Sequence, residues 1–265
     1  MQISGKKFLV TGAGNGMGRE VAIELLRRGA SVIGVDLNAD FLAETKILAT
    51  DKSEKFTPVV LDITNRESIK ELAAKHKDLD GLVNVAGIIQ PFVRVDSLEM
   101  SAVDRVMNVN FFGPLNLIHA FLPILKSRPE AHILNVSSMG SYAPVPGQTI
   151  YGASKAAVNL LTEGLRSELS ETKVKLTLVW PGAIATNITG NSGVNISSEA
   201  AADAPKTKTV SAADAGIQMV EAIEQNAKRI YIGSDAKFMG RLARFSTDTA
   251  AGLIYKNLKH LLGPA

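Results

Sequence analysis

The amino-acid sequence predicts an α/β fold, namely a single-domain, Rossmann-type, doubly wound parallel sheet of about seven strands with helices on both faces. Short apolar runs alternate with helical patterns along most of the 265 residues, as is typical of a parallel sheet covered on both sides. A glycine-rich turn joins the first apolar run to the first helix. Hydrophobic residues make up 46% of the chain, enough for a sizeable core. Without a visible repeat or linker, residues 1–265 read as one domain.

The first unit of the chain has the order strand, glycine turn, helix, strand. Residues 7–10 form a short apolar run that predicts a strand, and Gly12 follows it after one residue. A helical pattern begins at Gly16 and ends at a glycine before the next strand. Residues 31–35 form a second apolar run, directly followed by Asp36. This order predicts a βαβ unit.

The remaining elements follow the same alternation. We expect a capping box at Thr64–Glu67 to begin one helix, and we expect Pro114 and Pro123 to kink or end another. Strands are expected at residues 57–61, 82–86, 132–136, 175–179 and 229–232, and helices at residues 39–49, 64–77, 101–125, 151–169 and 211–226.

Two segments depart from this regular pattern. Residues 184–210 are rich in Asn, Ser, Thr, Gly and Ala and show little apolar periodicity. A disordered excursion is one interpretation; we favour a mobile lid, because the segment leaves a strand end beside the expected ligand site. Residues 235–262 form an amphipathic, basic segment that could lie on a membrane surface, cover a pocket or form a subunit interface. We favour the last two, because membrane-surface binding usually needs a stronger basic excess.

Composition excludes several classes of function. Lys and Arg exceed Asp and Glu by only three (29 − 26 = +3), without a long basic run, so no nucleic-acid partner is expected. The chain has no cysteine, and its four histidines lack ligand spacing, so we expect no metal. We find no signal-peptide pattern and no apolar window of about 18 residues, so we expect a cytoplasmic protein without a membrane partner.

The glycine turn favours phosphate binding. The strict dinucleotide pattern would need glycine in place of Met17, and a P-loop would need lysine after Gly18, so neither fingerprint is present. The turn nevertheless begins with Thr11 and lies between a strand and a helix. Gly12 would permit the tight turn, Gly16 the close approach of a pyrophosphate, and Gly18 the packing of the helix on the sheet. The helix N-terminus would supply amide donors.

Asp36 ends the second strand, where a carboxylate can accept both hydroxyls of an adenosine ribose and repel a 2′-phosphate. Asn15 stands where an arginine or lysine would help to hold such a phosphate. A solvated carboxylate at a strand end is the alternative interpretation. Because the glycines precede this strand, we favour binding of NAD(H) over NADP(H).

Tyr151 and Lys155 are four positions apart and therefore share one face of the expected helix. A free tyrosine titrates near pH ~10, and a cation beside it favours the phenolate and lowers its pKa. Such a tyrosine can pass a proton to or from an alcohol oxygen. The spacing is also common by chance, so the pair is interpreted as catalytic only because other motifs of the chain support that function.

Polar residues and glycines recur where the expected strands end. Ligands of doubly wound sheets bind at the carboxyl ends of the strands, so these residues are expected to gather at one edge. They are Gly12, Asp36, Asp62, Asn84, Ser138 and Pro181.

In this order and spacing, the motifs resemble those of the short-chain dehydrogenase/reductase family over about residues 5–190. Residues 11–18 match the family's glycine motif. Residues 84–87 match its Asn-Asn-Ala-Gly motif, with Val85 in place of the second asparagine. Ser138 lies 13 residues before Tyr151 (151 − 138), which is the family's spacing for its catalytic serine. The neighbouring Ser137 ranks lower on that spacing.

The resemblance implies a catalytic tetrad of Asn110, Ser138, Tyr151 and Lys155. Tyr151 would be the general base in alcohol oxidation and the general acid in ketone reduction. Lys155 would lower the pKa of that tyrosine, help to hold the nicotinamide ribose and connect to a water kept by Asn110. Ser138 would donate a hydrogen bond to the substrate oxygen.

The resemblance also implies the residues that hold the cofactor, expected to be NAD. Asp62 would contact the adenine, and the stretch from Pro181 to Thr186 would hold the nicotinamide carboxamide. The expected cofactor contacts are Gly12, Asn15, Gly16, Met17, Gly18, Asp36, Asp62, Ile63, Asn84, Ala86, Gly87, Tyr151, Lys155, Pro181, Gly182, Ile184 and Thr186.

Residues after the fourth, fifth and sixth strands are expected to line the substrate pocket. Most of them are apolar or uncharged, which favours a secondary alcohol or ketone on a hydrophobic body, although several could simply belong to the core. The candidates are Ile88, Ile89, Gln90, Ser138, Met139, Tyr142, Val145, Gln148, Tyr151, Ile184 and the loop 187–205.

The predicted function is that of an oxidoreductase that moves a hydride between NAD(H) and a secondary alcohol or ketone. An NADPH-dependent carbonyl reductase and a non-catalytic dinucleotide sensor are the alternatives. A sensor could dispense with the tetrad, whereas all four residue types are present. Members of the family commonly associate through the helices after strands four and five, so a homodimer or homotetramer is expected.

Overall fold

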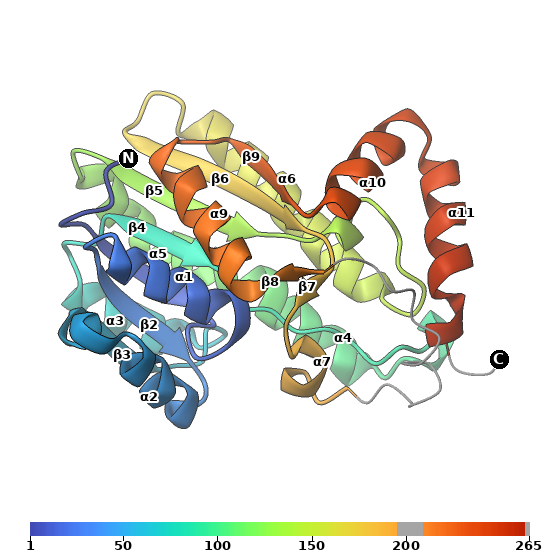
Figure 1. Ribbon diagram of the computed structural model, residues 1–265, viewed down its shortest axis with the longest axis horizontal. Coiled ribbons are helices and arrows are strands. Elements are labelled where there is room, and N and C mark those ends of the chain that lie inside the picture. The colour runs from blue at the N-terminus through green and yellow to red at the C-terminus, as the bar shows by residue number, and fades with distance from the viewer. Residues whose placement is uncertain (195–208, 263–265) are drawn as a thin grey trace.

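The computed structural model describes residues 1–194 and 209–262. Among these, seven parallel strands form one sheet in the order β3-β2-β1-β4-β5-β6-β9 (Figure 1). The order reverses between β1 and β4, as in a doubly wound sheet, so the predicted fold class is confirmed. The strands are β1 (Lys7–Thr11), β2 (Ser31–Asp36), β3 (Phe56–Val60), β4 (Gly81–Asn84), β5 (Ala131–Val136), β6 (Val174–Pro181) and β9 (Arg229–Ile232).

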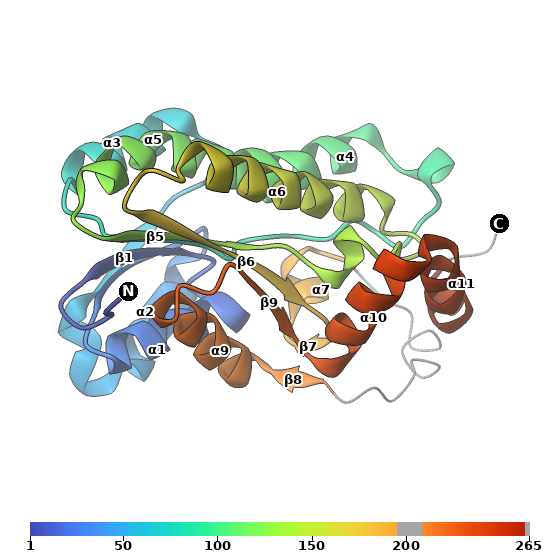
Figure 2. The same cartoon turned by 90° about the horizontal axis from the view of Figure 1, so that it is seen from above.

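Helices cover both faces of the sheet, as Figure 2 shows from above. One layer holds α1 (Gly16–Arg27), α2 (Ala39–Leu48) and α9 (Ala212–Glu224). The other holds α3 (Arg66–Lys75), α4 (Met100–Met107), α5 (Gly113–Ser127) and α6 (Thr149–Glu168). Each layer encloses its own apolar core against the sheet, because the central strands are buried on both faces. The short helical turns are η1 (Thr50–Lys55), η2 (Val95–Ser97), η3 (Asn108–Phe112), η4 (Met139–Ser141) and η5 (Lys259–Leu261).

The capping box expected to begin α3 at Thr64 is wrong. The Asn65 side chain is the cap, accepting a hydrogen bond from the amide of Ser68. Thr64 instead donates its hydroxyl to Asp62 at 2.8 Å. Either residue type can cap a helix, and the turn after β3 decides which of them lies at the cap position. Ser211 caps α9 as expected, because its hydroxyl accepts from the amide of Asp214.

The helix expected over residues 101–125 is divided. It begins as α4, widens into the π-helical turn η3, and continues as α5. Pro114 lies in the first turn of α5, where a missing N–H costs little. Pro123 lies inside α5, which continues to Ser127, so this proline does not end the helix.

The segment 184–210 is more regular than expected where it is described. Its ends form a small parallel pair, β7 (Ile184–Ala185) with β8 (Val210–Ser211), and α7 (Ile188–Asn191) follows β7. The rest of the predicted lid, residues 195–208, lies outside the described residues.

The amphipathic C-terminal segment folds into α10 (Ser234–Phe245) and α11 (Thr247–Leu258), which stand beside the main body in Figure 1. Their apolar faces form a small core of their own with the loop after β5: Met239 and Ile254 pack with Ala143, Met139 and Val145. The segment therefore covers a loop expected to line the substrate pocket. No described helix combines the length and apolar character that a membrane span requires.

Candidate active site

The glycine turn adopts the backbone that its glycines favour. Gly12 and Gly16 have φ values of +68° and +52°, a region open to glycine at little cost. A Cβ atom on Gly18 would collide with the carbonyl group of Gly12, so a glycine here lets α1 pack against the turn. The Asn15 side chain caps α1 by accepting from the amide of Gly16 at 2.6 Å. The helix N-terminus thus faces an open, glycine-lined turn suited to a pyrophosphate.

Asp36 lies directly against this turn. One carboxylate oxygen accepts from the amide of Gly14 at 3.0 Å, and the other accepts from the amide of Asn38 at 3.0 Å. The nearest guanidinium of the turn, that of Arg19, is occupied by the carbonyl of Gly14 and the carboxylate of Glu44. The position expected to meet the adenosine ribose therefore carries an oriented carboxylate, and the adjacent cation is already paired.

Thr11 fixes the loop after β4 next to the glycine turn. Its hydroxyl oxygen accepts from the amides of Val85 and Ala86, at 3.0 and 3.1 Å. Asn84 donates to Asn135 in the neighbouring strand at 2.8 Å, while its own side-chain oxygen is buried without a partner among the described residues. The departure at Val85 does not disturb this arrangement, because the contact is made by the backbone. Sequence reasoning did not predict these hydrogen bonds of Thr11, because the only signal was its place at the end of β1.

Asn110 sits in the π-helical turn η3 and is fully buried. Its side-chain oxygen accepts from the amide of Ile88 at 2.8 Å, and its side-chain nitrogen donates to the carbonyl of Ile88 and to the hydroxyl of Ser154. The asparagine therefore ties the loop after β4 to α6. Such local π turns occur often at functional sites.

The structure brings Ser138, Tyr151 and Lys155 together beneath two glycines. Ser138 follows β5, and its hydroxyl accepts from the amide of Gly140 at 3.0 Å. A Cβ atom on Gly140 would lie 3.4 Å from the Tyr151 ring and 3.5 Å from the Ser138 hydroxyl oxygen. One on Gly87 would lie 3.0 Å from the Lys155 ammonium and 3.3 Å from the Asn110 side-chain oxygen. The four residues of the predicted tetrad thus converge from three parts of the fold: η3, the end of β5 and α6.

Lys155 is anchored from the sheet. Its ammonium donates to the carbonyl of Val136 at 3.1 Å and lies 6.0 Å from the centre of the Tyr151 ring. Ser137, the less favoured serine, points into the fold instead, where its hydroxyl donates to the backbone carbonyl of Lys155 at 2.9 Å. This contact leaves Ser138 as the serine beside the tyrosine.

Burial dominates the electrostatics of this group. It raises the pKa of Tyr151 above its ordinary value, and the hydrogen bond with Ser138 offsets this only in part. Burial also lowers the pKa of Lys155 to about 8. The structure therefore does not show the lowered tyrosine pKa expected from the nearby lysine, because desolvation of the phenolate dominates.

Gln90 and Gln148, both expected at the substrate, make structural contacts. The side-chain oxygen of Gln90 accepts from the amides of Ile150 and Tyr151, at 2.8 and 3.0 Å. Gln148 donates its side-chain amide to the carbonyl of Gln90 at 2.6 Å. Gln90 thus caps the first turn of α6 from a distant loop. It fixes the position of the helix that carries Tyr151, a role with no local signal in the sequence.

The other predicted residues are distributed around the same end of the sheet. Thr186 lies close to Gly16, since a Cβ atom on that glycine would be 3.5 Å from the threonine methyl group. Ile63 packs against Gly113 at the start of α5, away from solvent. Met139 and Tyr142 pack with α10 and α11, and Tyr142 donates its hydroxyl to the carbonyl of Ala236. Met17, Asp62, Pro181, Gly182 and Ile184 lie at strand ends or in the glycine turn.

Comparison with known proteins agrees with this geometry. A family model described as short chain dehydrogenase matches residues 6–197. An oxidoreductase of Mycobacterium tuberculosis named SadH is 32% identical over 257 residues, covering 91% of this chain and 90% of its own length. An oxidoreductase of Staphylococcus saprophyticus is 32% identical over 196 residues, covering 72% of this chain and 83% of its own.

Solved structures give the same result. A short-chain dehydrogenase from Burkholderia cenocepacia in complex with NADP has a TM-score of 0.80 and 31% identity, over 96% of this chain and 99% of that one. A short-chain dehydrogenase/reductase from Burkholderia phymatum in complex with NAD has a TM-score of 0.84 and 25% identity, over 95% and 97%. These similarities define an oxidoreductase. The chain belongs to the short-chain dehydrogenase/reductase family.

Proposed function

We propose that the protein is an NAD(H)-dependent oxidoreductase that interconverts a secondary alcohol and a ketone on a hydrophobic substrate. The observation that carries this proposal is the convergence of Asn110, Ser138, Tyr151 and Lys155 beside Gly87 and Gly140, after β4 and β5. Bound nicotinamide supplies the hydride chemistry. The glycine turn, the N-terminus of α1 and the carboxylate of Asp36 fit the pyrophosphate and ribose of such a cofactor.

The protein's own groups handle the proton and the position of the substrate oxygen. Ser138 is beside the tyrosine and donates a hydrogen bond to that oxygen. Tyr151 holds a proton at neutral pH, because burial raises its pKa, so it is set to donate that proton to a ketone oxygen. In the oxidation direction the same phenol must first lose its proton, and the Lys155 ammonium, 6.0 Å from the centre of the ring, favours the phenolate electrostatically.

Cofactor preference rests on Asp36. Its carboxylate is held against the glycine turn by two amides and would face a 2′-phosphate with like charge. NADP(H) is the second candidate, because the similar protein from Burkholderia cenocepacia was solved with NADP. Titration of the protein with NADH and NADPH, followed by cofactor fluorescence, separates the two: tighter binding of NADH is expected.

A panel of secondary alcohols and ketones, monitored by NADH absorbance, tests the activity. When a substrate found this way is assayed, Tyr151→Phe is expected to lower kcat by about 10²-fold or more, which is the usual contribution of a positioned acid–base group. NADH binding should be nearly unchanged, because the ring itself is retained. Turnover of the variant close to wild type would remove Tyr151 from the mechanism. Tight NADH binding without turnover of any panel member would favour a dinucleotide sensor.

We also propose that the protein forms a homodimer or homotetramer through the face of α6 and η3. Leu160 on α6 is 76% exposed, and Phe112 in η3 is 37% exposed. Two large apolar side chains on neighbouring exposed helices support an interface there. Sedimentation velocity tests it: Leu160→Glu is expected to shift the protein toward the monomer, and a wild-type monomer would contradict the proposal.

A further inference from the structure

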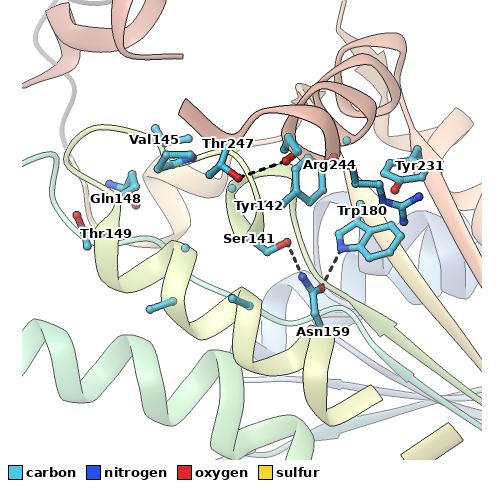
Figure 3. Close-up of a pocket in the computed structure, with 17 residues that line it drawn as sticks. Ser141, Tyr142, Val145, Gln148, Thr149, Asn159, Trp180, Tyr231, Arg244 and Thr247 are labelled. Carbon is cyan, nitrogen blue, oxygen red and sulfur yellow. Dashed lines mark hydrogen bonds between the residues drawn. The ribbon is translucent and has the colours of Figure 1, made fainter. Parts of the chain in front are cut away.

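A cavity of about 630 Å³ lies between α6, α10 and the loop after β5 (Figure 3). The Lys155 ammonium reaches from α6 to the Val136 carbonyl of the sheet. Gly152, Ala156 and Asn159, on a neighbouring face of α6, line the cavity together with the loop after β5 and with α10. Its volume falls within the ~300–1,000 Å³ typical of small-molecule sites.

The inner wall of the cavity is aromatic. Trp180 stacks on Tyr231, with ring centres 4.8 Å apart and planes inclined by 27°. Tyr142 meets both rings edge-on, at 6.1 and 6.3 Å. These rings come from the ends of β6 and β9 and from the loop after η4, and all three line the same space. Walls of this kind favour flat apolar ring systems, because ring–ring contacts add to the free energy of area burial.

The mouth of the cavity carries a positive charge. Arg244, near the end of α10, reaches toward the aromatic wall, and Thr247 at the start of α11 also lines the cavity (Figure 3). Among residues 1–194 and 209–262, no carboxylate forms an ion pair with Arg244. A guanidinium at the edge of an aromatic pocket suits a ligand that ends in a carboxylate or sulfonate.

The floor of the cavity is held in place by a chain of hydrogen bonds. The Trp180 indole donates to the side-chain oxygen of Asn159 at 2.9 Å. The side-chain nitrogen of Asn159 donates to the Ser141 hydroxyl at 2.8 Å, and that hydroxyl donates to the backbone carbonyl of Ser138 at 2.6 Å. Because its polar floor is already satisfied, the pocket is formed before any ligand enters it.

We propose that this cavity is a second small-molecule site, separate from the nucleotide cleft, that binds an apolar ring system with an anionic end. The rings lie against Trp180, Tyr231 and Tyr142, and the anion pairs with Arg244. The proposal does not depend on the proposed alcohol or ketone chemistry, because binding can be measured without turnover.

Trp180 makes a site-specific test possible because it is the only tryptophan in the chain. Its indole N–H gives one side-chain signal in a ¹H–¹⁵N correlation spectrum. The probe is 1-anilinonaphthalene-8-sulfonate, which has apolar rings and a sulfonate. The titration is run with saturating NADH and NADPH present, so that the nucleotide cleft is filled. A saturable shift of the indole signal is expected.

Matched variants test whether the sulfonate of the probe pairs with Arg244. Arg244→Gln is expected to weaken probe binding about fivefold, the loss of one partly exposed ion pair worth about 1 kcal/mol. Arg241→Gln, on the same exposed helix but outside the cavity lining, should leave the dissociation constant unchanged. Ala156→Phe, which places a ring inside the space, should reduce probe binding further. Both arginines are exposed, so these two variants are expected to fold.

Three results would overturn the proposal. The indole signal could stay in place throughout the titration. Arg244→Gln and Arg241→Gln could change the dissociation constant equally, which would remove the role of the charge. In the active enzyme, the probe could compete with the substrate, raising its KM at constant kcat, which would place the probe in the substrate pocket. An unchanged KM supports a separate site.

Discussion

Substitution of Lys155 tests whether burial of its charge lowers the stability of the folded protein. The ammonium is buried, and burial lowers its pKa to about 8 from an ordinary value of 10.5. The folded protein therefore carries a charge that would be better solvated in the unfolded chain. Lys155→Met keeps a similar length and removes the charge, so we expect this variant to be more stable than wild type at neutral pH while losing turnover.

The size of the effect follows from proton linkage. The lowered pKa corresponds to a free-energy cost of about 3 kcal/mol at pH 7, where both the folded and the unfolded lysine are protonated. The variant loses the hydrogen bond to the Val136 carbonyl, which offsets about 1 kcal/mol of this gain. The net expectation is about 2 kcal/mol of added stability at pH 7.

The pH dependence has a definite sign. Between pH 8 and 10.5 the unfolded chain binds the proton that the folded chain has already lost. The free energy of unfolding of the wild type therefore rises with pH across this window, by about 2–3 kcal/mol relative to the variant. The difference in the free energy of unfolding that favours Lys155→Met over the wild type should therefore shrink or change sign by pH 10.

Urea unfolding followed by circular dichroism measures the difference in the free energy of unfolding between Lys155→Met and the wild type, once at pH 7 and once at pH 10. Lys175→Met serves as the control, because Lys175 is an exposed lysine on β6, and its replacement should change neither difference by more than about 0.5 kcal/mol. A Lys155→Met protein that is less stable than wild type at pH 7, by an amount that does not change at pH 10, would refute the reasoning.

Three further predictions concern the cofactor and the tyrosine. Asp36→Ala should lower the ratio of kcat/KM for NAD over NADP about tenfold, the value of a hydrogen bond to a charged group; an unchanged ratio would show that Asp36 does not contact the ribose. Gly18→Ala should lower stability by about 1–3 kcal/mol and weaken NADH binding, because its Cβ would collide with Gly12, and thermal unfolding with fluorescence titration checks both. Because burial raises the pKa of Tyr151, kcat/KM for alcohol oxidation should increase with pH above neutrality, while that for ketone reduction should stay level until the phenol itself loses its proton; an oxidation profile that falls with pH would contradict the proton assignment.

Much of the fold could be predicted because parallel strands buried on both faces read as short apolar runs. The strands at residues 7–10 and 31–35 could be predicted from their own apolar residues, without knowing which strands pair with them. The π turn at Asn108–Phe112 left no trace in the sequence, since its residues are compatible with an ordinary helix. A proline normally interrupts a helix, yet α5 continues through Pro123 to Ser127.

The candidate site could be anticipated for a different reason. Side chains at the carboxyl ends of parallel strands must lie near one another, so Asp36, Asn84 and Ser138 could be placed from topology alone. The roles of Gln90 and Asn159 could not. Each acts on a partner far along the chain or across the fold, and neither lies in a recognisable motif. The pKa of Tyr151 also depends on how deeply the ring is buried, which spacing does not reveal.

The hydrogen bonds of Gln90 to the first turn of α6 limit how this protein can be redesigned. A change of substrate range would naturally begin with the loops after β4 and β5. Gln90 belongs to the first loop and Gln148 to the second, and together they hold the starting turn of the helix that bears the phenol. Loops grafted from a relative would therefore have to be exchanged as a pair, or the reactive ring would lose its alignment even with every catalytic side chain retained.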